Sequence, residues 1–200
     1  MAEQTMRARV PGEKIWWFPN VLTYGRIVAV PVLAALLIYG GITARWVAVA
    51  IYVAAAITDF FDGYLARLWK QQSALGRMLD PIADKVLVSV VLLVLAADGI
   101  LVGGSMWAAI IITAREVLVS GLREFLMELR VSVPVTKIAK WKTTVQLISI
   151  GFLIAGPAGD ALVPIITYAG IVLLWIAAAL TLYTGYDYFR AGLRHVVDEE

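Results

Sequence analysis

The chain has 200 residues, of which 61% are hydrophobic, and its formal net charge is +2. So high an apolar content excludes an ordinary soluble domain and indicates a protein that crosses the membrane several times. The chain contains no cysteine and one histidine, which excludes disulfides, thiolate zinc sites and multi-histidine metal sites. Any bound metal should therefore be an oxygen-liking cation such as Mg²⁺ or Mn²⁺.

Apolar segments follow one another along the chain, each close to or above the roughly 20 residues that a helix needs to cross a bilayer. They cover residues 21–39, 43–68, 82–98, 105–127, 138–156 and 163–188. We therefore predict an all-α polytopic membrane protein with six transmembrane helices. We expect one domain over residues 20–190, an N-terminal cytoplasmic or interfacial segment over 1–19 without a cleaved signal peptide, and a cytoplasmic tail over 191–200.

Basic residues are unevenly distributed over the breaks between these segments. The breaks near residues 40, 100 and 158 contain a single basic residue, Arg45. The two ends of the chain and the other two breaks contain many more: Arg7, Arg9, Lys14, Arg67, Lys70, Arg77, Arg130, Lys137, Arg190 and Arg194. Because loops rich in Lys and Arg remain in the cytoplasm, this distribution predicts that both termini are cytoplasmic.

Local signals predict where two of the helices begin. Asn20 is a suitable N-cap for the first segment. Asp80 followed by Pro81 predicts the N-cap and first helical residue of the third segment. That reading leaves Gly76 in the preceding loop and places Asp84 one turn inside the helix.

Four aspartates lie at the adjoining ends of the second and third segments: Asp59, Asp62, Asp80 and Asp84. On helices, Asp59 and Asp62 share one face, and so do Asp80 and Asp84. Carboxylates beside a membrane span are costly, which makes them candidates for a functional site. They cannot all stay ionised without positive charge, and no basic residue separates the members of either pair, so a bound divalent cation is the simplest compensation. The alternative is simple ion pairing with Arg67, Arg77 and Lys85.

The residues around these acids favour phosphoryl chemistry. Gly63 directly follows Asp62, and Ala66 lies three residues further on, so a bulky ligand has room beside the backbone. Arg67 is suited to neutralise a phosphate or to pair with an aspartate. Carboxylates and a divalent metal at a membrane surface suggest transfer of a phosphoryl group, with one aspartate taking the proton of an attacking hydroxyl.

A second polar group lies in the fourth and fifth segments. Arg115 and Glu116 inside an apolar segment are functional candidates because of their cost, and the alternative is an internal ion pair that fixes helix packing. Arg123, Lys140 and Lys142 are expected at the same level as the aspartates. A basic pocket there suits a small phosphorylated substrate, although ordinary snorkelling of basic side chains is the alternative.

The acidic motif resembles a known family signature. The pattern Asp59-x-x-Asp62-Gly63-x-x-Ala66-Arg67-x₈-Gly76-x₃-Asp80-x₃-Asp84 is similar to the signature of the CDP-alcohol phosphatidyltransferases, with every specified position present. The stretches NVLTYGRIVAVP (20–31), ITAREVLVSGLRE (112–124) and KIAKWKTTVQ (137–146) resemble the bacterial phosphatidylglycerophosphate synthases within that family. One departure is Ala139, where a glycine is expected before the lysine.

The resemblance implies a role for each motif residue. Asp59, Asp62 and Asp80 would ligate two Mg²⁺ or Mn²⁺ ions that hold the diphosphate of CDP-diacylglycerol, and Asp84 would complete the metal site and act as general base. Further residues would line the CDP site: Gly63, Ala66, Arg67 and Gly76. The hydroxyl of sn-glycerol 3-phosphate would attack the β-phosphorus, with CMP leaving.

The resemblance also implies surroundings and partners. The chain would be a homodimer in the lipid bilayer of a bacterial inner membrane, with its active site at the cytoplasmic face and no nucleic-acid partner. Basic residues would bind the acceptor phosphate: Arg115, Arg123, Lys140 and Lys142.

Two alternatives remain open from the sequence. The same family could use another acceptor, namely inositol phosphate, serine, or phosphatidylglycerol for cardiolipin; the basic residues favour a phosphorylated acceptor over serine. A cation transporter with intramembrane acids is the alternative from another class. The acids gather at one face, and no pair of broken helices marks a site at the membrane midplane, which disfavours transport.

Overall fold

The structure is a computed structural model that describes residues 18–68, 74–128 and 137–197, with side chains described except at 18–21, 60–68, 74, 75, 77, 128, 137 and 191–197. Within these ranges the chain forms six α-helices, so the predicted all-α class is confirmed. Their bounds are α1 Phe18–Tyr39, α2 Ile42–Leu68, α3 Ala74–Ala97, α4 Gly104–Glu128, α5 Lys137–Asp160 and α6 Ile166–Val197.

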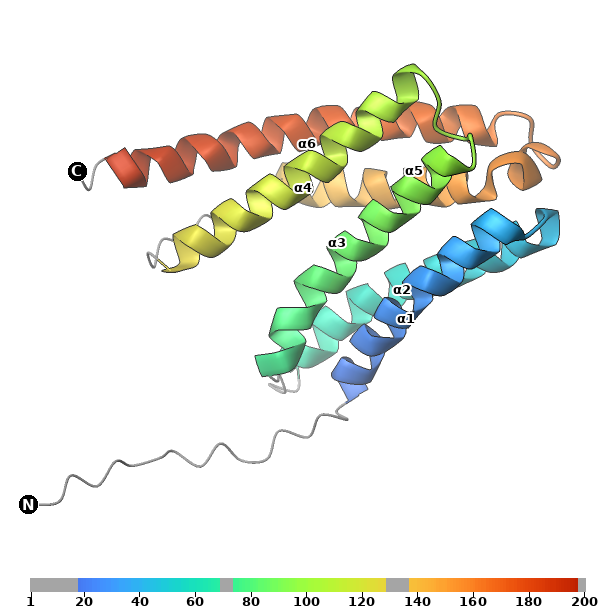
Figure 1. Cartoon of the computed structure of the whole chain (residues 1–200). Coiled ribbons are helices and arrows are strands. Elements are labelled where there is room, and N and C mark those ends of the chain that lie inside the picture. The colour runs from blue at the N-terminus through green and yellow to red at the C-terminus, as the bar shows by residue number, and fades with distance from the viewer. Residues whose placement is uncertain (1–17, 69–73, 129–136, 198–200) are drawn as a thin grey trace, which may run out of the picture.

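The helices pack as two groups of three (Figure 1). Helix α1 packs against α2 and α3, and α6 packs against α4 and α5. The two groups are joined mainly by the contact of α2 with α5, with smaller contacts of α3 with α4 and α5. Because consecutive helices run in opposite directions, the start of α1 and the end of α6 lie at the same end of the bundle; in Figure 1 α6 ends at the left and α1 begins near the lower centre. The connections from α1 to α2 and from α5 to α6 lie at the opposite end.

The interior is one apolar cluster to which every helix contributes. Its fully buried members include one large side chain from each helix: Leu33, Tyr52, Leu95, Ile112, Leu153 and Leu174. Many large apolar side chains remain exposed on the outside, among them Trp107, Trp141 and Tyr168. An exposed surface of this kind is expected where lipid is the solvent.

Four of the described helices, α1, α2, α4 and α6, are long and apolar enough to cross a membrane. Helices α3 and α5 are of similar length. Charged residues interrupt their apolar sequence, with Asp80, Asp84 and Lys85 in α3 and Lys140 and Lys142 in α5. The described part of the chain therefore has the helices of a polytopic membrane protein.

Two predicted helix starts are wrong. Helix α3 begins at Ala74, so Asp80 and Pro81 lie inside it rather than at its start, and Gly76 lies in its first turn rather than in a loop. Apart from Gly76, residues 74–79 are good helix formers, and they extend the helix beyond its apolar stretch. Helix α1 begins at Phe18, which places Asn20 inside the first turn, and Pro19 suits that position because its missing N–H has no partner there.

An ion pair joins three helices at the end of the bundle away from the start of α1. Arg45, in the first turn of α2, pairs with Asp98 just after α3, and its Nη1 donates a hydrogen bond to the Ile154 carbonyl of α5 at 3.2 Å. Helix α5 is kinked at Gly156, whose φ is 45°. A Cβ at Gly156 would lie 2.9 Å from Arg45 Nη1, so this glycine provides both the kink and the space for the arginine.

Candidate active site

The described part of the acidic motif is held together by α1. Asp59 lies near the end of α2, and Asp80 and Asp84 lie in the first half of α3. Arg26 Nη1 of α1 lies 2.5 Å from Asp59 Oδ1. Thr23 Oγ1, one turn earlier on α1, donates a hydrogen bond to Asp80 Oδ1 at 2.7 Å. The packing of α1 against both helices thus brings carboxylates of α2 and α3 to one place.

Asp84 connects this acidic group with the polar residues of the other three helices. The charges of Asp59 and Arg26 act on its carboxyl group from α2 and α1, and the charges of Glu116 and Lys142 act on it from α4 and α5. Its side chain is partly buried. Asp84 is therefore a described aspartate on which the charges of both polar groups act.

Other predicted residues of the motif are placed by their backbone. Asp62, Gly63, Ala66 and Arg67 lie on the last turns of α2, beyond Asp59, and their side chains lie outside the described part of the chain. Gly76 lies in α3, one turn before Asp80. The described motif positions therefore lie on the connected ends of α2 and α3, as predicted for the aspartates, whereas Gly76 lies in α3 and not in the predicted loop.

The donor set suits a hard divalent cation. Asp59, Asp80 and Asp84 offer only carboxylate oxygens, which Mg²⁺ and Mn²⁺ prefer, and charges act between Asp59 and each of the other two. Among the described side chains no three acidic groups converge closely enough to form a complete metal site. The prediction includes a fourth ligand, Asp62, whose side chain is outside that set. The chemistry of the described carboxylates thus fits such a cation, and with Asp62 they would form its ligand set.

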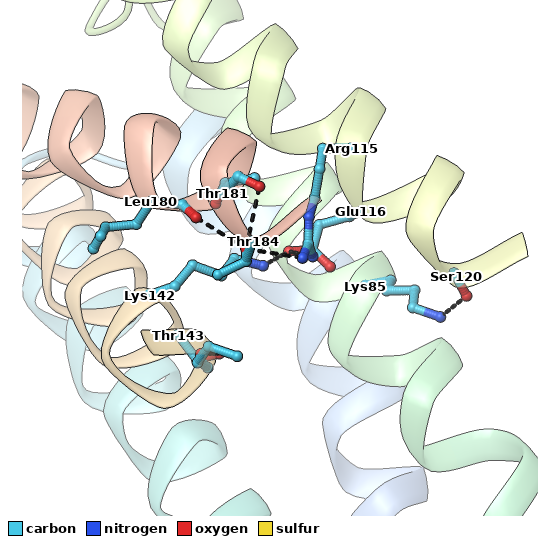
Figure 2. Close-up of polar contacts among 10 residues, drawn as sticks. Lys85, Arg115, Glu116, Ser120, Lys142, Thr143, Leu180, Thr181 and Thr184 are labelled. Atoms are coloured by element: carbon cyan, nitrogen blue, oxygen red, sulfur yellow. Dashed lines mark hydrogen bonds and ion pairs between the residues drawn. The ribbon is translucent and has the colours of Figure 1, made fainter. Parts of the chain in front are cut away.

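A second cluster joins α4, α5 and α6 (Figure 2). Glu116 of α4 forms an ion pair with the buried Lys142 of α5, and its Oε1 lies 3.7 Å from Arg115 Nη1. Arg115 Nη2 donates a hydrogen bond to Thr184 Oγ1 of α6 at 3.0 Å. Both basic side chains point toward Glu116 in Figure 2. The predicted internal ion pair at Glu116 is therefore present, and its principal partner is Lys142.

The predicted basic pocket is brought together only in part. Arg115 and Lys142 belong to the cluster, and Lys142 reaches Asp84 electrostatically. Arg123 and Lys140 have exposed side chains, and no contact among the described residues joins them to it. Lys85 is not a partner of the aspartates in the described contacts; it is hydrogen-bonded to Ser120 of α4 (Figure 2).

Three polar residues of these clusters were absent from the sequence prediction: Thr23, Arg26 and Thr184. The first two lie within the stretch NVLTYGRIVAVP. An arginine within the apolar residues 22–39 could have marked this stretch as functional, because burying its charge is costly. Nothing in the sequence distinguishes Thr184 from the other threonines of α6, since its role depends on the packing of α6 against α4.

Comparisons with known proteins agree on one family. A family model described as CDP-alcohol phosphatidyltransferase matches residues 16–183. Relatives named CDP-diacylglycerol–glycerol-3-phosphate 3-phosphatidyltransferase include proteins of Cereibacter sphaeroides, 41% identical over 92% of this chain and 99% of the relative, and of Rickettsia typhi, 44% identical over 86% and 95%. The relative of that name from Salmonella choleraesuis is 38% identical over 90% of this chain and 97% of its own length.

Proposed function

This chain belongs to the CDP-alcohol phosphatidyltransferase family, and we infer from its relatives that it transfers the phosphatidyl group of CDP-diacylglycerol to sn-glycerol 3-phosphate. The products are phosphatidylglycerophosphate and CMP. The observation that carries this conclusion is the near full-length match to several proteins that bear the name of this activity. That name also favours glycerol 3-phosphate over inositol phosphate, serine or phosphatidylglycerol as the acceptor.

Two divalent cations, Mg²⁺ or Mn²⁺, belong to this proposal. Asp59, Asp62, Asp80 and Asp84 would hold them, and the all-carboxylate chemistry of the three described members supports this assignment. When bound, such ions neutralise the diphosphate and make its phosphorus more electrophilic.

Asp84 is assigned as the general base. In the reaction, the acceptor hydroxyl forms a bond to the β-phosphorus, and the bond from that phosphorus to the bridging oxygen breaks, so that CMP leaves with the electron pair. The hydroxyl proton passes to the Asp84 carboxylate. The position of Asp84 between the acidic group and the Glu116–Lys142 pair supports this role, because the base must reach the acceptor while it lies beside the donor.

Lys142 and Arg115 are assigned to the acceptor phosphate. Glu116 holds the Lys142 ammonium group in place, and Thr184 holds the Arg115 guanidinium group, so both cations are positioned before the acceptor arrives. Arg123 and Lys140 have exposed side chains, and in this proposal they attract the acceptor toward the pocket. The CDP moiety is assigned to Gly63, Ala66, Arg67 and Gly76, whose place on the facing ends of α2 and α3 supports the assignment.

The proposal places all six helices across a bacterial inner membrane, with both termini and the site at the cytoplasmic face, and the protein as a homodimer. The four strongly apolar helices and the alternating direction of all six support the six spans. In this arrangement the charged first halves of α3 and α5 lie at the cytoplasmic end, where the water-soluble acceptor enters.

CMP release by the purified protein tests the proposed function. CDP-diacylglycerol and Mg²⁺ are supplied with glycerol 3-phosphate, inositol phosphate, serine or phosphatidylglycerol in parallel. We expect release with glycerol 3-phosphate alone, its loss on addition of EDTA, and its return with excess Mg²⁺ or Mn²⁺. Release with another acceptor would keep the family and overturn the acceptor, and release that persists in EDTA would overturn the role of the metal.

A further inference from the structure

Helix α1 carries two polar side chains whose burial needs an explanation. Thr23 and Arg26 are each 2% exposed, in a helix that is otherwise apolar enough to cross a membrane. Burying an arginine in such a helix is costly unless it has a specific partner. The two residues are three positions apart, so they lie on the same face of α1.

Each of these side chains contacts a different helix of the acidic motif. Thr23 donates its hydrogen bond to Asp80 on α3, at 2.7 Å, and Arg26 pairs with Asp59 on α2, at 2.5 Å. Both of these contacts are made to the Oδ1 atom of the carboxylate. One face of α1 therefore fixes the orientation of one carboxylate from each of the two helices that form the motif.

The contact with Arg26 leaves the Asp59 carboxylate accessible to a further ligand. The Asp59 side chain is 46% exposed although its arginine partner is almost completely buried. Carboxylates that bind metals are usually oriented by hydrogen bonds from outer residues, and loss of such a partner costs about 10- to 100-fold in metal affinity or activity. A buried donor behind a half-exposed carboxylate is the arrangement that this kind of orientation requires.

We propose that Thr23 and Arg26 are positioning residues that orient Asp80 and Asp59 for binding of the divalent cation. Thr23 does so as a neutral donor. Arg26 does so as a cation that also offsets part of the negative charge of the acid cluster while the metal is absent. The inference rests on the metal-binding part of the proposed function. It adds that α1, which contains none of the motif residues, supplies the side chains that orient the metal-binding carboxylates.

Binding of Mn²⁺ to the full-length protein in detergent, followed by electron paramagnetic resonance of the free ion, tests this role without turnover. For Thr23→Val, which keeps the shape and removes the donor, we expect a dissociation constant about 10- to 100-fold higher. Thr23→Ser, which keeps the hydroxyl, should bind as the unchanged protein does. Thr58→Val is the matched control, because the Thr58 hydroxyl bonds only to the Ala55 carbonyl of its own helix in the described contacts.

The route through the aspartate is tested by combining substitutions. If Thr23 acts through Asp80, Thr23→Val should have no further effect on Mn²⁺ affinity in an Asp80→Asn background. For Arg26, Arg26→Lys keeps the charge and loses the planar fork, and we expect weaker Mn²⁺ binding at an unchanged KM for glycerol 3-phosphate. This variant tests the proposal should Thr23→Val not fold.

Unchanged Mn²⁺ affinity in both folded Thr23→Val and folded Arg26→Lys would overturn the inference, as would an equal loss in Thr58→Val. Failure of the proposed function looks different. In that case the unchanged protein would release no CMP, whatever its Mn²⁺ affinity. If this inference alone fails, the unchanged protein would still release CMP, and its Mn²⁺ affinity would not depend on Thr23 or Arg26.

Discussion

Two arginine–aspartate pairs lie at opposite ends of this bundle, and their surroundings differ. Arg45 is enclosed by Asp98 and the Ile154 carbonyl, and the glycine at the α5 kink provides the space for it. Arg26 instead faces Asp59, a half-exposed carboxylate on which the charge of Asp80 also acts. The first pair is a closed contact between helices, whereas the second includes a half-exposed carboxylate on which other acids act. A buried arginine–aspartate pair in a membrane helix therefore indicates a functional site when its carboxylate stays accessible, and a structural contact when both partners are enclosed.

The largest effect is expected at the residue between the two polar groups. Asp84→Asn should lower the rate of CMP release by about 10²- to 10⁴-fold if Asp84 takes the proton of the acceptor. Its fold should persist, because the change keeps the size of the side chain. Single-turnover rates with saturating acceptor measure the effect, and a near-normal rate would remove Asp84 from this role.

A smaller effect is expected at the buried lysine. Lys142→Met should raise the KM for glycerol 3-phosphate by about 10-fold or more, because loss of one partner of a buried charge pair costs at least about 2 kcal/mol. The KM for CDP-diacylglycerol should change less. Steady-state kinetics with each substrate varied in turn checks this, and equal changes in both values would contradict a dedicated acceptor pocket.

The exposed lysine should matter less than the buried one. Lys140→Ala should raise the KM for glycerol 3-phosphate by up to about fivefold, since an exposed charge contributes about 0.2–1 kcal/mol. The effect should shrink as salt is added, because the charges of exposed groups are screened. An effect as large as that of Lys142→Met would place Lys140 inside the pocket.

A substitution beside the Arg45–Asp98 pair, at the other end of the bundle, should lower stability and leave the rate of CMP release nearly unchanged. Gly156→Ala puts a side chain at a left-handed backbone position and close to Arg45, which should cost about 1–3 kcal/mol of stability. The Tm of the protein in detergent measures this loss. CMP release below that Tm should match the unchanged protein, and a selective loss of turnover would show that this end takes part in the reaction.

The same contrast explains what the sequence could and could not predict. Helix number and class follow from apolar segments, and the acidic motif could be identified because its members are close in sequence. The apolar segment begins near Pro81, which is why the predicted helix start is too late. The helix itself begins at Ala74, because the residues before the apolar segment also favour a helix. Proximity in sequence indicates Arg67, Arg77 and Lys85 as partners of the acids, whereas the charge that pairs with Asp59 comes from Arg26 of α1. Contacts of that kind depend on which helices pack together.

The most direct test of this account compares Asp59→Asn with Asp98→Asn, two equal changes at the two arginine–aspartate pairs. CMP release and Tm are measured for both proteins in the same detergent. We expect Asp59→Asn to lose at least about 100-fold in turnover, because a metal ligand supports several kcal/mol of catalysis. Asp98→Asn should keep its turnover and lose about 1–3 kcal/mol of stability, because Arg45 is left without its charged partner. Loss of turnover in Asp98→Asn at an unchanged Tm, or normal turnover in Asp59→Asn, would contradict the account.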